Sequence, residues 1–242
     1  MPFAISKFLC VVALMANLSV RAEGLNGEPI PEMLWRDFKS PVTTDAKYYL
    51  GGSTALTLVI FLNDRTLDQR VQEDIAVRKP LGSWHKFGDY GGQGIANALY
   101  VLGAWALQEN QEALLMARAS LMAVAFTTVL KPVVGEPRPD DPNHHDSFPS
   151  GHATAAFAFA SVIGTQHHWA WGVAAYSFAA FVGFSRINDN AHVLHDVIAG
   201  ATIGTVYGLG ISWRDQARSA NAWNWLPMVA GGAPGITAGR EF

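Results

Sequence analysis

Six long apolar segments constrain the fold of this chain more than any other feature of its sequence. They are rich in Ala, Leu, Val, Phe and Gly, and they cover residues 48–63, 90–108, 113–130, 151–166, 169–185 and 197–212. Each segment is long enough for a helix and longer than an ordinary strand. The sequence therefore predicts an all-α fold, a helical bundle of about six core helices over residues 48–213.

The regions outside these segments are more polar. Residues 23–47 contain proline and show no sustained period, which favours an N-terminal arm. Between the first two apolar segments, four apolar residues recur at helical spacing: Leu67, Val71, Ile75 and Ala76. This spacing predicts a short amphipathic helix. The C-terminal tail, residues 214–242, is rich in Gly and Pro beyond Asn221, and we expect either a short hairpin or an arm there.

The first 22 residues have the pattern of an export signal. Lys7 supplies the positive charge, an apolar stretch runs from Phe8 to Val20, and Val20-Arg21-Ala22 offers a small-residue cleavage site. We expect an exported, periplasmic protein whose mature chain starts at Glu23, with an uncleaved membrane anchor as the alternative. The single cysteine, Cys10, excludes a disulfide framework and a cysteine metal site within one chain.

Charge is scarce along the chain. Charged residues make up 15%, against roughly 25% in typical soluble domains. The net charge is −3 and no basic run is present, which excludes a broad electrostatic surface for nucleic acid. Nucleic acid is therefore not an expected partner.

The lengths of the apolar segments do not decide whether they span a bilayer. A span needs about 20 mostly apolar residues, whereas the charge-free stretches 48–63 and 169–185 hold 16 and 17 residues. Four tryptophans lie near segment ends, as in an interfacial belt: Trp105, Trp169, Trp171 and Trp213. We expect a soluble or membrane-associated protein outside the cytoplasmic membrane, with an integral inner-membrane protein as the alternative.

Three polar clusters lie where the apolar segments end. Lys131 and Arg138-Pro139 follow the third segment, and Pro149-Ser150-Gly151-His152 precedes the fourth. The run Ser185-Arg186-x5-His192-x3-Asp196 joins the fifth segment to the sixth. In a bundle whose helices alternate in direction, these ends meet at one face. The three clusters therefore predict a single pocket.

The pocket has the composition of a phosphate-binding site. Lys131, Arg138 and Arg186 bring three cations into a charge-poor protein, and guanidinium groups match the paired oxygens of phosphate. Ser150 is a good helix N-cap, and Gly151 lets the backbone approach closely, so that the amides opening the helix add donors. Such a cradle needs no metal, because the cations neutralise the developing charge.

Two histidines in the pocket fit two catalytic roles. His192 and Asp196 are four residues apart, which on a helix places both on one face, where the carboxylate orients the imidazole. The other ring nitrogen of His192 is then free to act as a nucleophile. His152, across the phosphate, is suited to protonate the leaving alcohol.

Other histidines suggest no site of their own. His144 and His145, flanked by Asp141 and Asp146, have the residue types of a metal site, but a polar loop is the expected reading. His195 either lines the pocket or only follows the third cluster, and we assign it no role.

The three clusters together resemble the signature of the type 2 phosphatidic acid phosphatase (PAP2) superfamily, without a gap or substitution, over about residues 113–212. The resemblance implies a phosphohistidine intermediate on His192, protonation of the leaving group by His152, and orientation by Asp196. It also implies that five residues bind the phosphate: Lys131, Arg138, Ser150, Gly151 and Arg186. The superfamily includes membrane lipid phosphatases, soluble bacterial acid phosphatases and vanadium haloperoxidases.

The resemblance implies a metal-independent phosphatase without a cofactor, acting on phosphomonoesters or on lipid phosphates and diphosphates outside the cytoplasmic membrane. A vanadium-dependent haloperoxidase-like enzyme is the alternative, because the same cradle holds vanadate, although the short chain argues against it. An inactive phospholipid-binding protein is less expected, because the signature is complete. The motifs specify neither the leaving group nor the oligomeric state.

Overall fold

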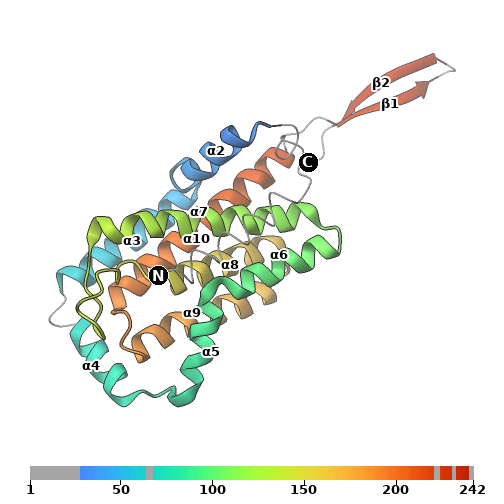
Figure 1. Cartoon of the computed structure of the whole chain (residues 1–242). Coiled ribbons are helices and arrows are strands. Elements are labelled where there is room, and N and C mark those ends of the chain that lie inside the picture. Colours follow the sequence, from blue (N-terminus) through green and yellow to red (C-terminus); the bar gives the residue numbers. More distant parts are fainter. Residues whose placement is uncertain (1–27, 64–67, 221–223, 231–232, 240–242) are drawn as a thin grey trace.

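The computed structural model describes residues 28–63, 68–220, 224–230 and 233–239 and shows an all-α bundle followed by a two-stranded hairpin (Figure 1). The α-helices described are α2 (Ile30–Thr43), α3 (Ala46–Leu62), α4 (Asp68–Arg78), α5 (His85–Tyr90), α6 (Ala96–Ala106), α7 (Asn110–Val134), α8 (Gly151–Gln166), α9 (Trp169–Asn188) and α10 (Leu194–Ala220). A 3₁₀ turn, η2 (Gly82–Trp84), precedes α5, and a π-helical turn, η3 (Gly91–Ile95), joins α5 to α6.

The core of the bundle lies around α10, which packs against α8, α7 and α3. Met116, Val162 and Ile211 from these helices are completely buried in it. The contact between α8 and α10 is backbone to backbone: a Cβ atom added at Gly204 would lie 2.3 Å from the carbonyl oxygen of Thr154. Glycine on α10 therefore lets the backbones of α8 and α10 pack closely against each other.

Each of the six predicted apolar segments contains a helix, and the amphipathic helix is confirmed as α4. The second segment was expected to form one helix, but η3 interrupts it. Gly94 has a φ of 79°, a left-handed conformation that suits glycine and interrupts the helix. The last helix continues beyond the expected end of the core to Ala220. The tail then forms the hairpin alternative, with β1 (Asn224–Ala230) antiparallel to β2 (Ala233–Gly239).

The expected N-terminal arm over residues 23–47 is wrong for most of its length, because α2 and the start of α3 occupy it. A buried ion-pair network fixes α2 to the bundle. Asp37 is completely buried and accepts hydrogen bonds from Arg118 Nε at 2.8 Å and Nη2 at 2.6 Å. Arg118 also pairs with Asp215 at 2.6 Å, and Arg214 lies 2.5 Å from Asp37. This contact brings together residues far apart in the chain, so local periodicity does not reveal it. The predicted export signal, residues 1–22, lies outside the described residues.

The outer surface of the bundle is unusually apolar. Two described helices are long and apolar enough to cross a membrane, α7 and α10, although 78% of the most apolar window of α10 is buried in the protein. Large apolar side chains are exposed on α3, α6 and the start of α9: Leu56, Leu58, Phe61, Leu62, Leu99, Leu102, Trp105, Trp169, Trp171 and Val173. Where such side chains form a large exposed patch, the patch typically contacts lipid or another protein.

Candidate active site

The structure brings the three predicted clusters together at one end of the bundle. The end of α7 carries Lys131, the loop after it carries Arg138, and the start of α8 carries Ser150, Gly151 and His152. Arg186 lies near the end of α9. The backbone N–H of Ser150 donates to the carbonyl oxygen of Asp196 at 3.0 Å, which joins the second cluster directly to the third.

His192 and Asp196 form a buried pair. Their side chains are 2% and 0% exposed, and His192 Nδ1 lies 3.4 Å from Asp196 Oδ2. The expectation that both residues lie on one helix is wrong, because α10 begins only at Leu194. The chain turns at Asn190, where φ is 62°, and the N–H of His192 then bonds back to the carbonyl oxygen of Arg186. The turn, and not a helix face, brings the imidazole to the carboxylate.

Ser147, which the sequence did not single out, completes this pair. Its hydroxyl donates to Asp196 Oδ2 at 2.6 Å and lies 3.4 Å from His192 Nδ1. The N–H of Val193 donates to the same carboxylate oxygen at 3.1 Å. These donors fix the Asp196 carboxylate beside Nδ1 of His192, so Nε2 is the ring nitrogen left for a substrate. No motif spacing marks Ser147, because its position depends on the path of the loop before α8.

The environment of His192 favours the neutral imidazole. Burial lowers the pKa of His192 below its ordinary value of 6.5, and the charges of Lys131 and Arg138 lower it further. Asp196 acts in the opposite direction and raises the pKa, but it does not outweigh the other effects. A neutral imidazole has a free lone pair, which a nucleophile requires.

The two cations of the first cluster, Lys131 and Arg138, are held by Asp146. Arg138 Nε donates to Asp146 Oδ1 at 2.6 Å, and Nη2 donates to Oδ2 at 3.3 Å. Lys131 Nζ donates to the backbone carbonyl oxygen of Asp146. Burial raises the pKa of Asp146, but the bond and charge of Arg138 outweigh burial and lower it below its ordinary value. The loop between α7 and α8 therefore folds back on both cations.

Ser150 is the N-cap of α8, as predicted. Its hydroxyl oxygen accepts from the N–H of Ala153 at 3.5 Å, and Gly151 is the first residue of the helix. The first amides of α8 therefore open towards the end of the bundle that holds His192. A helix N-terminus with unpaired amides favours an anion.

Arg186 and His152 meet at Asp89 on α5, a residue that the sequence analysis missed. Arg186 Nη1 donates to Asp89 Oδ1 at 2.7 Å, and His152 Nε2 lies 3.1 Å from the same oxygen. Arg186 also donates to Asp189 at 2.6 Å and to the hydroxyl of Ser185 at 3.3 Å. The contact with His152 lowers the pKa of Asp89 to about 2, against the effect of burial and together with the charge of Arg186. Asp89 is therefore ionised at neutral pH.

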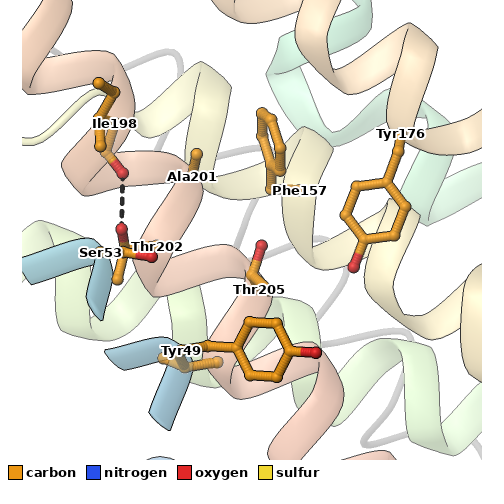
Figure 2. A pocket seen from close by; sticks show the side chains of 9 residues that line it. Tyr49, Ser53, Phe157, Tyr176, Ile198, Ala201, Thr202 and Thr205 are labelled. Atoms are coloured by element: carbon orange, nitrogen blue, oxygen red, sulfur yellow. Dashed lines mark hydrogen bonds between the residues drawn. The ribbon is translucent and has the colours of Figure 1, made fainter. Parts of the chain in front are cut away.

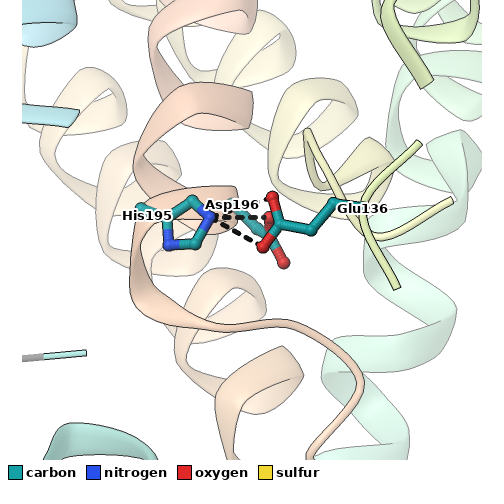
Figure 3. A group of neighbouring side chains, drawn as sticks. All are labelled: Glu136, His195 and Asp196. Atoms are coloured by element: carbon teal, nitrogen blue, oxygen red, sulfur yellow. Dashed lines mark hydrogen bonds and ion pairs between the residues drawn. The ribbon is translucent and has the colours of Figure 1, made fainter. Parts of the chain in front are cut away.

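A second group of ionisable residues lies beside Asp196 (Figure 3). His195 Nε2 lies 3.0 Å and 3.1 Å from the two carboxylate oxygens of Glu136 and 3.6 Å from Asp196 Oδ1. The Nδ1 atom of His195 contacts the buried carboxylate of Asp68 on α4. Glu136, His195 and Asp196 are ligand types for a divalent cation, but here the imidazole and the carboxylates pair with one another.

His144 and His145 do not belong to that group. His144 Nδ1 lies 2.7 Å from Asp141, and both side chains are exposed. The ring of His145 lies 3.1 Å from the backbone carbonyl oxygen of Gly135. Each ring has its own partner on the loop, which agrees with the polar-loop interpretation.

A cavity of about 340 Å³ lies between α3, α8, α9 and α10, apart from the predicted site residues (Figure 2). Its lining combines apolar and hydroxyl side chains: Tyr49, Ser53, Phe157, Tyr176, Ile198, Ala201, Thr202, Thr205 and Val206. Ile198 lies two residues beyond Asp196 on α10. The lining holds no charged side chain, so this cavity is not the phosphate site.

The geometry can be set beside known proteins. The PAP2 superfamily model matches residues 112–220. The matched region contains all of the predicted site residues.

Individual relatives match parts of the chain. A lipid A 1-phosphatase of Porphyromonas gingivalis is 41% identical over 78 residues, which cover 31% of this chain and 17% of that protein. The crystal structure of Aquifex aeolicus LpxE is similar with a TM-score of 0.51 and 25% identity, and the similarity covers 62% of this chain and 96% of that chain. The crystal structure of the first transmembrane PAP2 type phosphatidylglycerolphosphate phosphatase from Bacillus subtilis gives a TM-score of 0.40 and 19% identity over 90% of this chain and 98% of that chain.

Proposed function

We propose that this protein is a metal-independent phosphatase that hydrolyses phosphoric esters through a phosphohistidine intermediate on His192. One observation carries the proposal: a buried His192–Asp196 pair lies at the same end of the bundle as Lys131 and Arg138, within a PAP2 domain. Phosphoryl transfer to a histidine requires a nucleophilic ring nitrogen beside permanent cations. It also benefits from a carboxylate that fixes the other ring nitrogen, as Asp196 does for Nδ1 of His192.

The proposed reaction has two steps. First, Nε2 of neutral His192 attacks phosphorus, the bond from phosphorus to the ester oxygen breaks, and His152 gives its proton to the departing oxygen. Second, His152 takes a proton from water, the oxygen of that water attacks phosphorus, and the bond from phosphorus to Nε2 breaks. Phosphate leaves and His192 is again neutral. Asp196 keeps the proton on Nδ1 and stabilises the positive imidazole of the intermediate.

The cations bind the transferred group. Lys131, Arg138 and Arg186 offset the charge on the equatorial phosphoryl oxygens, and the Gly151 amide, which opens α8 after the Ser150 cap, adds a donor. No cofactor takes part in this mechanism. Carboxylates hold both guanidinium groups in place, which reduces the rearrangement needed when substrate binds.

We further propose a lipid phosphate or diphosphate as substrate and a membrane-associated, exported protein. The exposed apolar side chains on α3, α6 and α9 provide a surface suited to lipid, and the matched relatives include a lipid A 1-phosphatase. The export signal predicted over residues 1–22 would place this chemistry in the periplasm.

Fractionation of cells tests this assignment. We expect the protein to stay with membranes after an alkaline carbonate wash and to be released by detergent, because its exposed helices prefer lipid. In detergent micelles, a lipid phosphate should be hydrolysed faster than a soluble phosphomonoester at the same concentration. Recovery of all activity in the carbonate wash, with no preference for lipid, would contradict the membrane assignment.

Removal of divalent metal should leave turnover unchanged, because the proposed charge neutralisation depends on side-chain cations. Vanadate should inhibit competitively, since it adopts the trigonal-bipyramidal geometry of transfer. Assays after dialysis against EDTA, with and without added Mg²⁺ or Zn²⁺, measure the first effect. Activity lost on dialysis and restored by a divalent cation would refute the metal-independent mechanism and direct attention to Glu136, His195 and Asp196. Halide oxidation with bound vanadate would instead favour the haloperoxidase alternative.

A further inference from the structure

Asp89 lies outside the matched PAP2 region and outside every motif in the sequence, yet it contacts two proposed active-site residues. One oxygen, Oδ1, lies 3.1 Å from His152 Nε2 and 2.7 Å from Arg186 Nη1. His152 comes from α8 and Arg186 from α9, so a third helix, α5, joins these two groups. A single carboxylate oxygen therefore lies within reach of both groups.

The backbone around Asp89 is built for this contact. A Cβ atom at Gly92 would lie 2.6 Å from the Cβ of His152, and one at Gly88 would lie 2.1 Å from the hydroxyl oxygen of Ser185. Both distances are far below ordinary carbon contacts, so only glycine lets this segment lie flat against α8 and α9. The close packing places Asp89 next to both His152 and Arg186.

We propose that Asp89 is a positioning residue of the phosphatase, which fixes the general acid His152 relative to the phosphate-binding Arg186 and so determines how well the enzyme expels poor leaving groups. This inference rests on the proposed function, because it assigns Asp89 to the same reaction.

Charge and exposure support this role. Asp89 is 40% exposed, whereas Arg186 is 6% exposed, so Asp89 lies at the edge of the site and not beneath it. His152 must approach the leaving oxygen, and Asp89 therefore lies on the side of the site where the leaving group sits. Contacts to Asp89, Asp189 and Ser185 use three of the five N–H groups of Arg186, which leaves donors for the phosphoryl oxygens.

A purely structural role of Asp89 would lower turnover of all substrates alike. A positioning role predicts that the loss of turnover depends on the leaving group. In Asp89→Asn, turnover of an alkyl phosphate should fall by about 10–100-fold, by analogy with the loss of a carboxylate that orients a metal-ligating histidine. Turnover of nitrophenyl phosphate should fall much less, because nitrophenolate departs without a proton. Asp89→Glu, which keeps the charge, should recover part of the loss on the alkyl ester. Asp74→Asn, an exposed carboxylate paired with Arg78 on α4, is the matched control and should leave both rates unchanged.

A double-mutant cycle shows whether Asp89 acts through His152. When His152→Ala has already removed the acid, adding Asp89→Asn should cost little further on the alkyl ester. Thermal unfolding of each variant shows whether the fold is intact. Competitive inhibition by inorganic phosphate shows whether the cations still bind an anion.

The outcomes separate the two proposals. Equal losses on both esters, or a full loss in the His152→Ala background, would overturn the positioning role. Unchanged turnover with at least about tenfold tighter inhibition by phosphate, a change of 1.4 kcal/mol, would also overturn it and show that Asp89 only competes with phosphate for Arg186. A wild-type protein that hydrolyses no phosphoric ester, or a His192→Ala variant as active as wild type, would overturn the proposed function and this inference together.

Discussion

His192→Ala is expected to abolish hydrolysis of every phosphoric ester, including those with good leaving groups. The variant lacks the nitrogen that accepts the phosphoryl group, and loss of a nucleophile in a hydrolytic triad costs about 10⁶-fold in turnover. Binding of inorganic phosphate should be largely retained, because Lys131, Arg138 and Arg186 remain in place. This separation of turnover from binding distinguishes a nucleophile from a binding residue.

A covalent trap tests the assignment directly. Wild-type protein mixed with substrate labelled in the phosphoryl group and quenched in alkali, which preserves phosphohistidine, should carry label, and His192→Ala should not. His144→Ala is the matched control, because His144 is an exposed histidine of the loop between α7 and α8. It should be labelled like wild type. Label on His192→Ala at the wild-type level would place the nucleophile on another residue.

The sequence predicts most of the bundle because its helices are long and their polar ends carry recognisable clusters. Alternating helices bring those ends together whatever the details of the loops, so the meeting of Ser150 with Asp196 follows from topology. The break at η3 is not predictable from the sequence, because several glycines lie in this apolar run and nothing in the sequence indicates which one adopts a non-helical conformation. The helix α2 was missed because the burial of Asp37 against Arg118 depends on contacts between distant segments.

The residues that hold the proposed catalytic groups are less predictable from the sequence than those groups themselves. Ser147 and Asp89 each contact residues of the signature, and Asp68 contacts His195 beside it, but each lies on a segment whose local pattern is ordinary. Their contacts depend on how α4, α5 and the loop before α8 pack in the folded protein. The signature therefore identifies the groups that we propose to contact phosphate, and the three-dimensional structure identifies the carboxylates and hydroxyls beside them.

Asp196→Asn separates a catalytic carboxylate from an ordinary histidine partner. An exposed ion pair between residues four apart on a helix contributes about 0.3–0.5 kcal/mol to stability. If Asp196 made only such a contact, its substitution would change turnover little. Asp196, however, is completely buried and accepts from Ser147 and Val193 while it faces His192. Asparagine keeps an acceptor for one side of this network but loses the negative charge that stabilises a positive His192 and fixes its proton on Nδ1.

We therefore expect Asp196→Asn to lower turnover by at least about 10²-fold, since the equivalent change in a protease triad costs about 10⁴-fold. The pH profile should shift as well. Asp196 raises the pKa of His192 against the lowering effect of burial, so its neutralisation lowers that pKa further. Because the nucleophile must be neutral, the acid limb of kcat/KM should move to lower pH even as the plateau falls. Asp141→Asn breaks an exposed pair between Asp141 and His144, and it should change neither the plateau nor the limb. A folded Asp196→Asn variant that keeps most of the wild-type turnover, with an unmoved acid limb, would show that the carboxylate does not act on His192 and that the nucleophile lies elsewhere in the site.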